Sequence, residues 1–241
     1  MMANIVHGPA RPKRRSTHAS GRGLLMLGMA LASAICVAVF ISYVLWPRRP
    51  GPPVALDAPA LPITVSGVTF NVPPAAIRVP LQRRTGTQER IDLVFLWPSL
   101  TPPDPAAKPS PGTPPASPLD RLFVTIAGSN GTLAPVDRWK TIYPRYTVRD
   151  PDAGPDGLAV LAFRSGTPYQ GEDLVYEATA PERFFVRCTR GAGPTPGTCL
   201  REQRIGTADL TVRFPRVWLQ EWRTVAPAID RLIAGLHPVG G

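Results

Sequence analysis

The longest apolar segment of the chain covers residues 23–46 and contains no charged side chain. As an α-helix rising about 1.5 Å per residue it would be about 36 Å long, enough to cross a hydrocarbon core of about 30 Å. Tyr43 and Trp46 stand at its far end, and such aromatic side chains favour the membrane–water interface. The segment therefore predicts a transmembrane helix in contact with the lipid bilayer.

After residue 62 the hydrophobic pattern changes to short segments rich in β-branched and aromatic residues, which are typical of strands. Leu210–Phe214 alternates most clearly, and 206–209 is expected to form the hairpin turn that precedes it. Gly67 predicts a bend or bulge inside the first segment. Strands are expected over 63–70, 90–97, 121–127, 158–164, 174–178, 183–189, 199–205 and 210–214.

Near the C-terminus, residues 216–236 carry apolar side chains at intervals of four and three, which places them on one face of a helix. Pro215 suits the first turn, whereas Pro227 predicts a kink or break near Ala226. A shorter helix is expected over 136–143. The apolar stripe is expected to pack into the core, with a partner-binding face as the alternative; it consists of Trp218, Trp222, Val225, Ile229, Leu232 and Leu236.

Two segments hold many of the 31 prolines. Residues 47–62 contain six, which favours an extended stalk in polyproline II geometry. Residues 98–118 contain nine, and the piece between the two segments is too short for a core of its own. We therefore expect 98–118 to be a loop inserted into one domain that covers 63–238, with the strands on either side in the same sheet.

These elements together predict an α+β fold. It comprises an N-terminal transmembrane helix, a proline-rich stalk, and a mostly antiparallel β-sheet domain with a C-terminal amphipathic helix packed on it.

The formal net charge of +10 is concentrated around the apolar segment. Residues 1–49 contain seven Lys and Arg and no acidic residue, whereas 20 basic and 17 acidic residues give 50–241 a net charge of +3. Basic residues ahead of a span favour a cytoplasmic location. We therefore expect 1–22 to be a cytoplasmic tail, 23–46 to cross the bacterial inner membrane, the domain to be periplasmic, and no nucleic-acid partner. The alternative is a secreted protein cleaved near Ala58-Pro59-Ala60, but the apolar segment is long for a signal peptide.

Export gives the cysteines a structural meaning. Cys188 and Cys199 fall in two predicted strands on either side of a short loop, so we expect a disulfide that ties a hairpin together. A redox-active pair is the alternative, although the spacing is not Cys-x-x-Cys. Cys36 lies within the span, where a free thiol behaves as a small apolar group.

The pattern of potential catalytic and metal-binding residues is mostly negative. No histidine occurs in 47–236, which excludes a Ser-His-Asp or Cys-His set there unless His237 folds back. The DPDAGPDG segment at 150–157 lacks the ligands of an EF-hand loop and is expected to form two turns, the second suited to a hairpin. The sequence thus assigns no catalytic, cofactor-binding or metal-binding residue.

Two charge clusters have more than one interpretation. Glu172, Asp173 and Glu177 are expected on a solvated turn, and the alternative is a pair of catalytic carboxylates. Residues 182–231 contain nine Arg and five acidic residues, a bias expected on a solvated surface, with contact to an anionic polymer as the alternative.

Four features carry a resemblance to known proteins: ITVSGVTFNVPPAAIRVP at 63–80, ERIDLVFLWPSL at 89–100, GTPYQGEDLVYEA at 166–178, and paired cysteines before a Trp-rich C-terminal helix. Together they resemble a group of uncharacterised single-span, membrane-anchored proteins of proteobacteria. The resemblance covers most of 63–236 and implies the topology described above. The group has no assigned activity, so the resemblance implies no catalytic residue.

These observations favour a binding or scaffold domain over an enzyme. We expect an accessory component of an envelope complex with a protein partner that the sequence does not name. The alternative is an envelope enzyme that uses carboxylates alone to act on peptidoglycan or another glycan.

Overall fold

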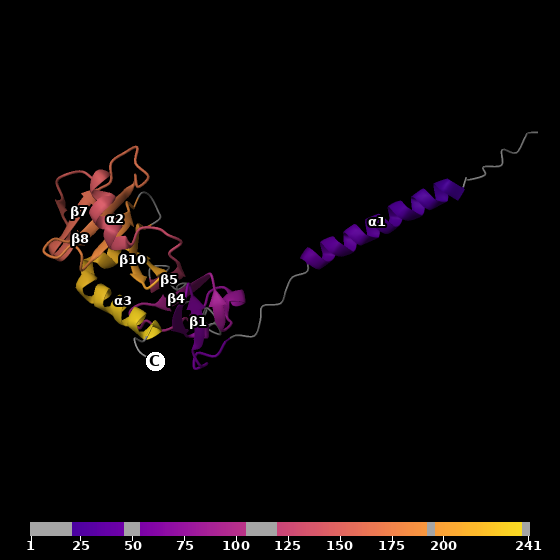
Figure 1. Cartoon of the computed structure of the whole chain (residues 1–241), viewed down its shortest axis with the longest axis horizontal. Helices are drawn as coiled ribbons and strands as arrows, with labels where there is room; N and C mark the ends of the chain where they lie inside the picture. The colour runs from indigo at the N-terminus through magenta and orange to yellow at the C-terminus, as the bar shows by residue number, and fades with distance from the viewer. Residues whose placement is uncertain (1–20, 46–53, 105–119, 192–195, 238–241) are drawn as a thin grey trace, which may run out of the picture. The chain divides into compact units, whose positions relative to one another are not determined.

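The computed structural model describes residues 21–45, 54–104, 120–191 and 196–237. The chain divides into two compact units, 1–50 and 51–241. In the first unit, helix α1 (Gly21–Leu45) carries the apolar segment (Figure 1). Its stretch Gly23–Val44 is long and apolar enough to cross a membrane, and none of it is buried. The free Cys36 lies within this helix, as expected.

The second unit contains an antiparallel sheet of eight strands in the order β4-β5-β11-β10-β9-β8-β7-β6 (Figure 1). Strands β4 and β5, which flank residues 98–118, pair directly, so the expectation that they share a sheet is confirmed. Residues 105–119 of that segment lie outside the described residues. The strands are β4 (Arg90–Leu96), β5 (Arg121–Gly128), β6 (Asp152–Ala153), β7 (Leu158–Ala162), β8 (Glu172–Glu177), β9 (Phe185–Thr189), β10 (Thr198–Ile205) and β11 (Ala208–Pro215).

A second, three-stranded sheet was not expected from the sequence. The predicted single strand over 63–70 is wrong: it is a hairpin of β1 (Leu61–Val65) and β2 (Val68–Val72). Ser66 (φ 50°) and Gly67 (φ 85°) both adopt positive φ, which reverses the chain instead of bending it. Strand β3 (Gly86–Gln88) pairs parallel with β1. The predicted stalk therefore ends before Leu61, and its residues 47–53 lie outside the described residues.

The described part of the second unit also contains two α-helices. Helix α2 (Pro135–Thr141) matches the short helix expected at 136–143. Helix α3 (Trp222–Leu236) follows a 3₁₀ segment, η6 (Arg216–Glu221), and runs without interruption through Ala226, so the prediction of a break at that residue is wrong. Pro227 stands within α3, on its exposed side. The described residues also contain the 3₁₀ turns η1 (Pro74–Ala76), η2 (Pro80–Gln82), η4 (Tyr143–Arg145) and η5 (Pro155–Gly157).

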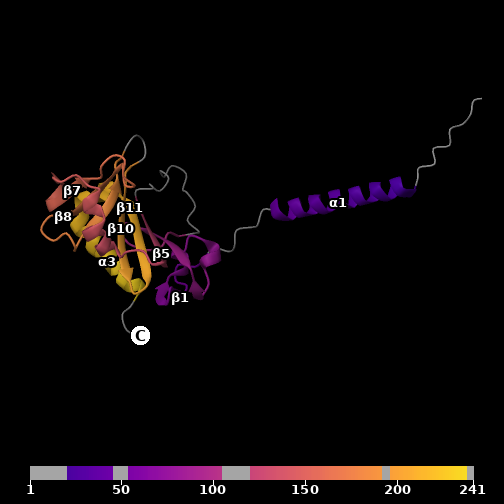
Figure 2. The same ribbon diagram turned by 45° about the horizontal axis from the view of Figure 1, so that its top comes forward.

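The core lies between one face of the large sheet, helix α3 and the small sheet. Alternate side chains of β11 and β5 enter it, and the two tryptophans of the predicted stripe are buried there, Trp218 at 8% and Trp222 at 4% exposure. Figure 2 shows α3 lying along the large sheet. The expected α+β fold, with a C-terminal helix packed on an antiparallel sheet, is therefore confirmed.

Helix α2 covers part of the opposite face. Its Trp139 packs on Tyr176 of β8 and Phe185 of β9, with ring centroids 4.9 and 5.5 Å away. A small second cluster of Tyr143, Phe163 and Leu174 lies beside it. Further along the same face, over β4, β5 and β11, the structure leaves a groove.

Candidate binding groove

The groove has a volume of about 510 Å³ and runs along the outer side of β5. Because side chains alternate along a strand, Leu122 and Val124 point into the core while Arg121, Phe123 and Thr125 point into the groove. The remaining lining residues come from the segment before β4, from β4, from β10 and β11, and from the loop before β10. They are Arg78, Arg90, Asp92, Pro196, Gly197, Thr198, Arg213, Phe214 and Pro215.

Strand register places two of these side chains, Phe123 and Arg213, next to each other across the sheet. Phe123 of β5 lies opposite Arg213 of β11 on one side and Val94 of β4 on the other. The Arg78 guanidinium carbon stands 4.8 Å from the centre of the Phe123 ring, a distance at which a cation is attracted to the ring face. The backbone N–H of Arg78 donates to the carbonyl oxygen of Asp92 (2.9 Å), which holds this segment along β4. Phe123 is therefore the centre of a groove with arginines on both sides.

Gly197 closes one wall. A Cβ atom at this position would lie 2.6 Å from the carbonyl oxygen of Thr189, so no other residue fits without movement of the backbone. Thr198 lies next to it, and its N–H donates to the hydroxyl of Thr189 (2.9 Å). Gly197 and Thr198 are thus held against the end of β9.

Asp92 is the one carboxylate among the lining residues. It accepts from Arg90 (2.8 Å), the Thr125 hydroxyl (2.9 Å) and the Gln82 amide (3.3 Å). Burial raises the pKa of Asp92, but the hydrogen bonds from Arg90, Gln82 and Thr125 outweigh it and lower the pKa below its ordinary value. The same hydrogen bond raises the pKa of Arg90. Asp92 is therefore ionised and already occupied by donors.

The other three arginines of the groove have no internal counter-charge. Within the described ranges, Arg78, Arg121 and Arg213 form no ion pair. All 17 acidic side chains of the chain fall inside these ranges, and only Asp92 lines the groove. Four guanidinium groups and one carboxylate give the lining a net charge of +3. Chemically, the groove offers planar, multidentate donors to an anion, with an aromatic and proline surface beside them.

The acidic cluster is not on a solvated turn, so that expectation is wrong. Glu172, Asp173 and Glu177 belong to β8, and each forms an ion pair with an arginine of β9 or the segments around it. Asp173 is 6% and Glu177 3% exposed. Asp173 contacts Arg190 at 2.6 Å and Arg216 at 2.7 Å. Burial of a carboxylate is tolerated because a paired cation compensates the lost hydration.

The basic bias of 182–231 has a similar explanation. Seven of its nine arginines form ion pairs with acidic side chains of the same domain; they are Arg183, Arg187, Arg190, Arg201, Arg204, Arg216 and Arg223. Of the other two, Arg213 lines the groove. The local excess of arginine therefore mostly serves internal pairing.

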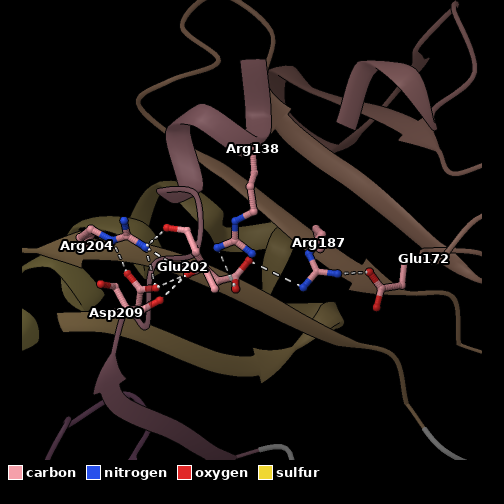
Figure 3. A network of polar contacts seen from close by, with 8 residues as sticks. Arg138, Glu172, Arg187, Glu202, Arg204 and Asp209 are labelled. Atoms are coloured by element: carbon pink, nitrogen blue, oxygen red, sulfur yellow. Dashed lines mark hydrogen bonds and ion pairs between the residues drawn. The ribbon is translucent and has the colours of Figure 1, made fainter. Parts of the chain in front are cut away.

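A polar network links α2 to the sheet (Figure 3). Glu202 of β10 stands between Arg138 of α2 (3.2 Å) and Arg187 of β9 (3.7 Å), and Arg187 also pairs with Glu172 (2.8 Å). Arg187 lies over the ring of Tyr143, whose burial raises the pKa of its hydroxyl to about 12. These groups contact one another, which indicates a structural role for the network.

Several smaller predictions concern the rest of the domain. The structure contains the disulfide Cys188–Cys199, which joins directly opposite residues of β9 and β10. Residues 152–162 form the expected hairpin, with Asp156 and Gly157 at positive φ. His237 does fold back: its Nδ1 lies 2.9 Å from the carbonyl oxygen of Thr69, on β2. In the part of the chain that the structure describes, no three His, Cys, Asp or Glu side chains are arranged to hold a metal ion.

The groove does not follow from the sequence alone, because its arginines come from four separate segments. Arg78 precedes β4, Arg90 begins β4, Arg121 begins β5 and Arg213 lies in β11. The alternation of Leu210–Phe214 did place Arg213 on the polar face of its strand. Nothing local to the sequence indicates that the other three meet it there.

The fold and the groove define the second unit as an α+β domain with a cationic concave surface on its sheet.

No family model matches the chain, and no curated protein matches it. Among solved structures, an immunity protein of the Stenotrophomonas maltophilia type IV secretion system is similar, with a TM-score of 0.48 and 14% identity over 77% of this chain and 98% of that one. The iron-regulated outer membrane lipoprotein FrpD of Neisseria meningitidis has a TM-score of 0.42 and 10% identity over 77% of this chain and 95% of that one. Neither similarity defines a function for this chain.

Proposed function

We propose that this chain is a single-pass inner-membrane protein whose C-terminal domain binds a partner in the periplasm, as an accessory component of an envelope complex. The observation that carries the binding role is the groove, where three exposed or half-buried arginines lack an internal counter-charge. Uncompensated like charges on one surface are unfavourable unless a partner neutralises them. Binding of a partner explains why the three arginines lie together on one surface.

Two features support the topology within this proposal. Helix α1 is apolar, fully exposed and long enough to span a bilayer, and basic residues precede it. The Cys188–Cys199 disulfide suits an oxidising compartment. Both features favour a domain on the periplasmic side of the membrane.

A carboxylate-dependent enzyme finds no specific support in the acidic cluster. Glu172, Asp173 and Glu177 are each paired with an arginine in β9 or beside it. Carboxylates held in ion pairs within the sheet already have internal partners, and Asp173 and Glu177 are buried. We therefore do not extend the proposal to catalysis.

Protease accessibility tests the topology. Proteinase K added to spheroplasts is expected to degrade the domain at 54–237, while intact cells protect it. Mass measurement of the membrane-bound protein is expected to return the full 26.0 kDa chain. A domain that survives in spheroplasts would refute the orientation, and a mature chain beginning near Ala60 would refute the anchor.

A photo-crosslinking amino acid tests partner binding in the native membrane. Placed at Arg121 in the groove, it is expected to capture a discrete protein partner. Placed at Arg231, which is exposed on α3, it is expected to capture none of that partner. Equal capture at both positions would refute the groove as the binding surface.

A further inference from the structure

We infer that the groove binds an extended, acidic segment of a protein partner, with carboxylate side chains seated on the arginines and an apolar side chain beside Phe123. This inference rests on the proposed binding function and identifies the chemistry of the partner. The four arginines of the groove exceed the one carboxylate that lines it.

Three arginines of the groove lack a counter-charge within the domain. Arg78 and Arg213 are exposed and Arg121 is half-buried, and none of the three forms an ion pair in the described residues. The residues outside the described ranges contain no Asp or Glu, so they hold no acidic side chain that would neutralise the arginines of the groove. No acidic side chain of this chain therefore neutralises the three arginines, and an anionic partner would supply the complementary charge.

The shape of the groove suits an extended chain. From Arg121 to Thr125 the groove follows five residues of β5, a distance of about 14 Å, which matches four to five residues of an extended peptide. Groove-facing side chains recur every second residue along β5, with the same period as the side chains of an extended peptide. A concave strip of this length fits a linear chain better than it fits the flat surface of a bilayer.

The lining of the groove mixes charged and apolar groups. Phe123, which is half-buried, and Pro196, which is exposed, offer apolar surface beside the guanidinium groups. A bare anion would leave that surface exposed to water, whereas a peptide with alternating acidic and apolar side chains covers both. Arginine also forms bidentate hydrogen bonds with carboxylates, which fixes the register of the segment.

Asp92 sets the charge at one end of the groove. Because its carboxylate accepts from Arg90, Thr125 and Gln82, it lowers the positive charge at that end while holding Arg90 in place. The uncompensated charge therefore lies toward Arg78, Arg121 and Arg213. Removal of the Asp92 charge is expected to strengthen binding of an anionic peptide, an effect that damage to the fold cannot produce.

Fluorescence anisotropy with a defined probe tests the inference. The probe is a fluorescein-labelled peptide with the core Glu-Ser-Phe-Ser-Glu, capped by acetyl and amide groups, added to the full-length protein in nanodiscs of phosphatidylcholine. We expect saturable binding that weakens as salt is raised, and no binding of the matched Gln-Ser-Phe-Ser-Gln and Lys-Ser-Phe-Ser-Lys peptides.

The variants use a matched pair of exposed arginines. Arg213→Gln is expected to weaken binding of the acidic probe about tenfold, an effect typical of one lost charge-assisted contact. Arg231→Gln removes the same charge from the exposed side of α3 and is expected to leave binding unchanged. Asp92→Asn is expected to strengthen it about threefold.

Several results would overturn the inference. They are a failure of the acidic probe to bind, equal losses in Arg213→Gln and Arg231→Gln, or Arg213-dependent binding of inorganic phosphate or a short-chain phosphatidylglycerol but not of the peptide. The protease experiment in spheroplasts is independent of all three. A correct topology without peptide binding would refute only this inference, and peptide binding by a cytoplasmic domain would refute only the proposed function.

Discussion

The Arg201 guanidinium on β10 donates a hydrogen bond to the carbonyl oxygen of Ala226 on α3 at 3.0 Å. Arg201 is among the few buried charged residues, and its charge is balanced by Asp230 at 2.9 Å. The guanidinium also lies over the ring of Phe184, 5.6 Å from the ring centre. One side chain thus ties the C-terminal helix to the middle of the large sheet.

Replacement of Arg201 by Met is therefore expected to destabilise the domain by about 2 kcal/mol, the scale of a lost hydrogen bond to a charged group. Met retains the apolar stem, and the partner Asp230 is half exposed and remains hydrated. Asp230→Asn, which removes the exposed partner alone, is expected to cost less than about 1 kcal/mol. Urea unfolding of both variants measures the difference. Equal effects would show that the ion pair, and not the bond to Ala226, links the helix to the sheet.

The disulfide supplies a second stability prediction. Cys188 and Cys199 are separated by 11 positions in sequence, and the bond restricts the unfolded chain over that loop. The chain-entropy estimate for a loop of this length is about 3 kcal/mol. The double variant Cys188→Ala/Cys199→Ala is expected to lose stability of that order, and wild type with dithiothreitol should lose a similar amount. Identical unfolding curves with and without reductant would contradict a stabilising bond.

The lowered pKa of Asp92 predicts that the stability of the domain falls at acidic pH. Its pKa is lower in the folded domain than in the unfolded chain, so its contribution is fully present above the unfolded value of about 4 and is lost as pH falls through the folded value. Asp92→Asn is expected to be less stable than wild type at pH 7, with a difference that shrinks below about pH 4. Urea unfolding across this range tests it. A difference that is constant with pH would show that the charge of Asp92 is not involved.

Tyr143 predicts the opposite dependence at alkaline pH. Burial raises its pKa from the ordinary 10.0 to about 12, and its hydroxyl has no hydrogen-bond partner in the described structure. Stability linked to Tyr143 is therefore fully present below about pH 10 and is lost as pH rises toward 12. Tyr143→Phe is expected to be within about 1 kcal/mol of wild type at pH 7, because it removes an unpaired polar atom, and to resist alkaline unfolding better. Unchanged alkaline stability would contradict the raised pKa.

Local patterns in the sequence predict those elements whose partners lie nearby or whose periodicity is strong. The alternation at Leu210–Phe214 and the stripe from Trp218 to Leu236 correctly assign strand β11 and the buried face of the C-terminal helix. The small sheet was missed because its hairpin turn requires positive φ at both Ser66 and Gly67. A glycine indicates such a conformation by its residue type, whereas a serine does not. Pro227 did not locate the change from 3₁₀ to α-helix, which falls at Glu221.

Charged residues show the limit of such patterns. Glu172, Asp173 and Glu177 are acidic and closely spaced, which is typical of a surface turn, yet they lie in a strand whose neighbours supply arginines. Whether a charge is solvated or paired depends on the register between strands. That register is a property of long-range pairing and does not follow from local composition.

The sequence by itself determined the apolar helix with its basic flank, the kind of fold, the cysteine pair and the buried face of the C-terminal helix. Each of these depends on periodicity, local charge or short separation along the chain. Only the tertiary structure decided that most arginines pair internally, while Arg78, Arg121 and Arg213 meet around Phe123 without a counter-charge. The physical reason is that strand pairing brings together residues up to 135 positions apart, and no local pattern encodes which charges that pairing leaves uncompensated.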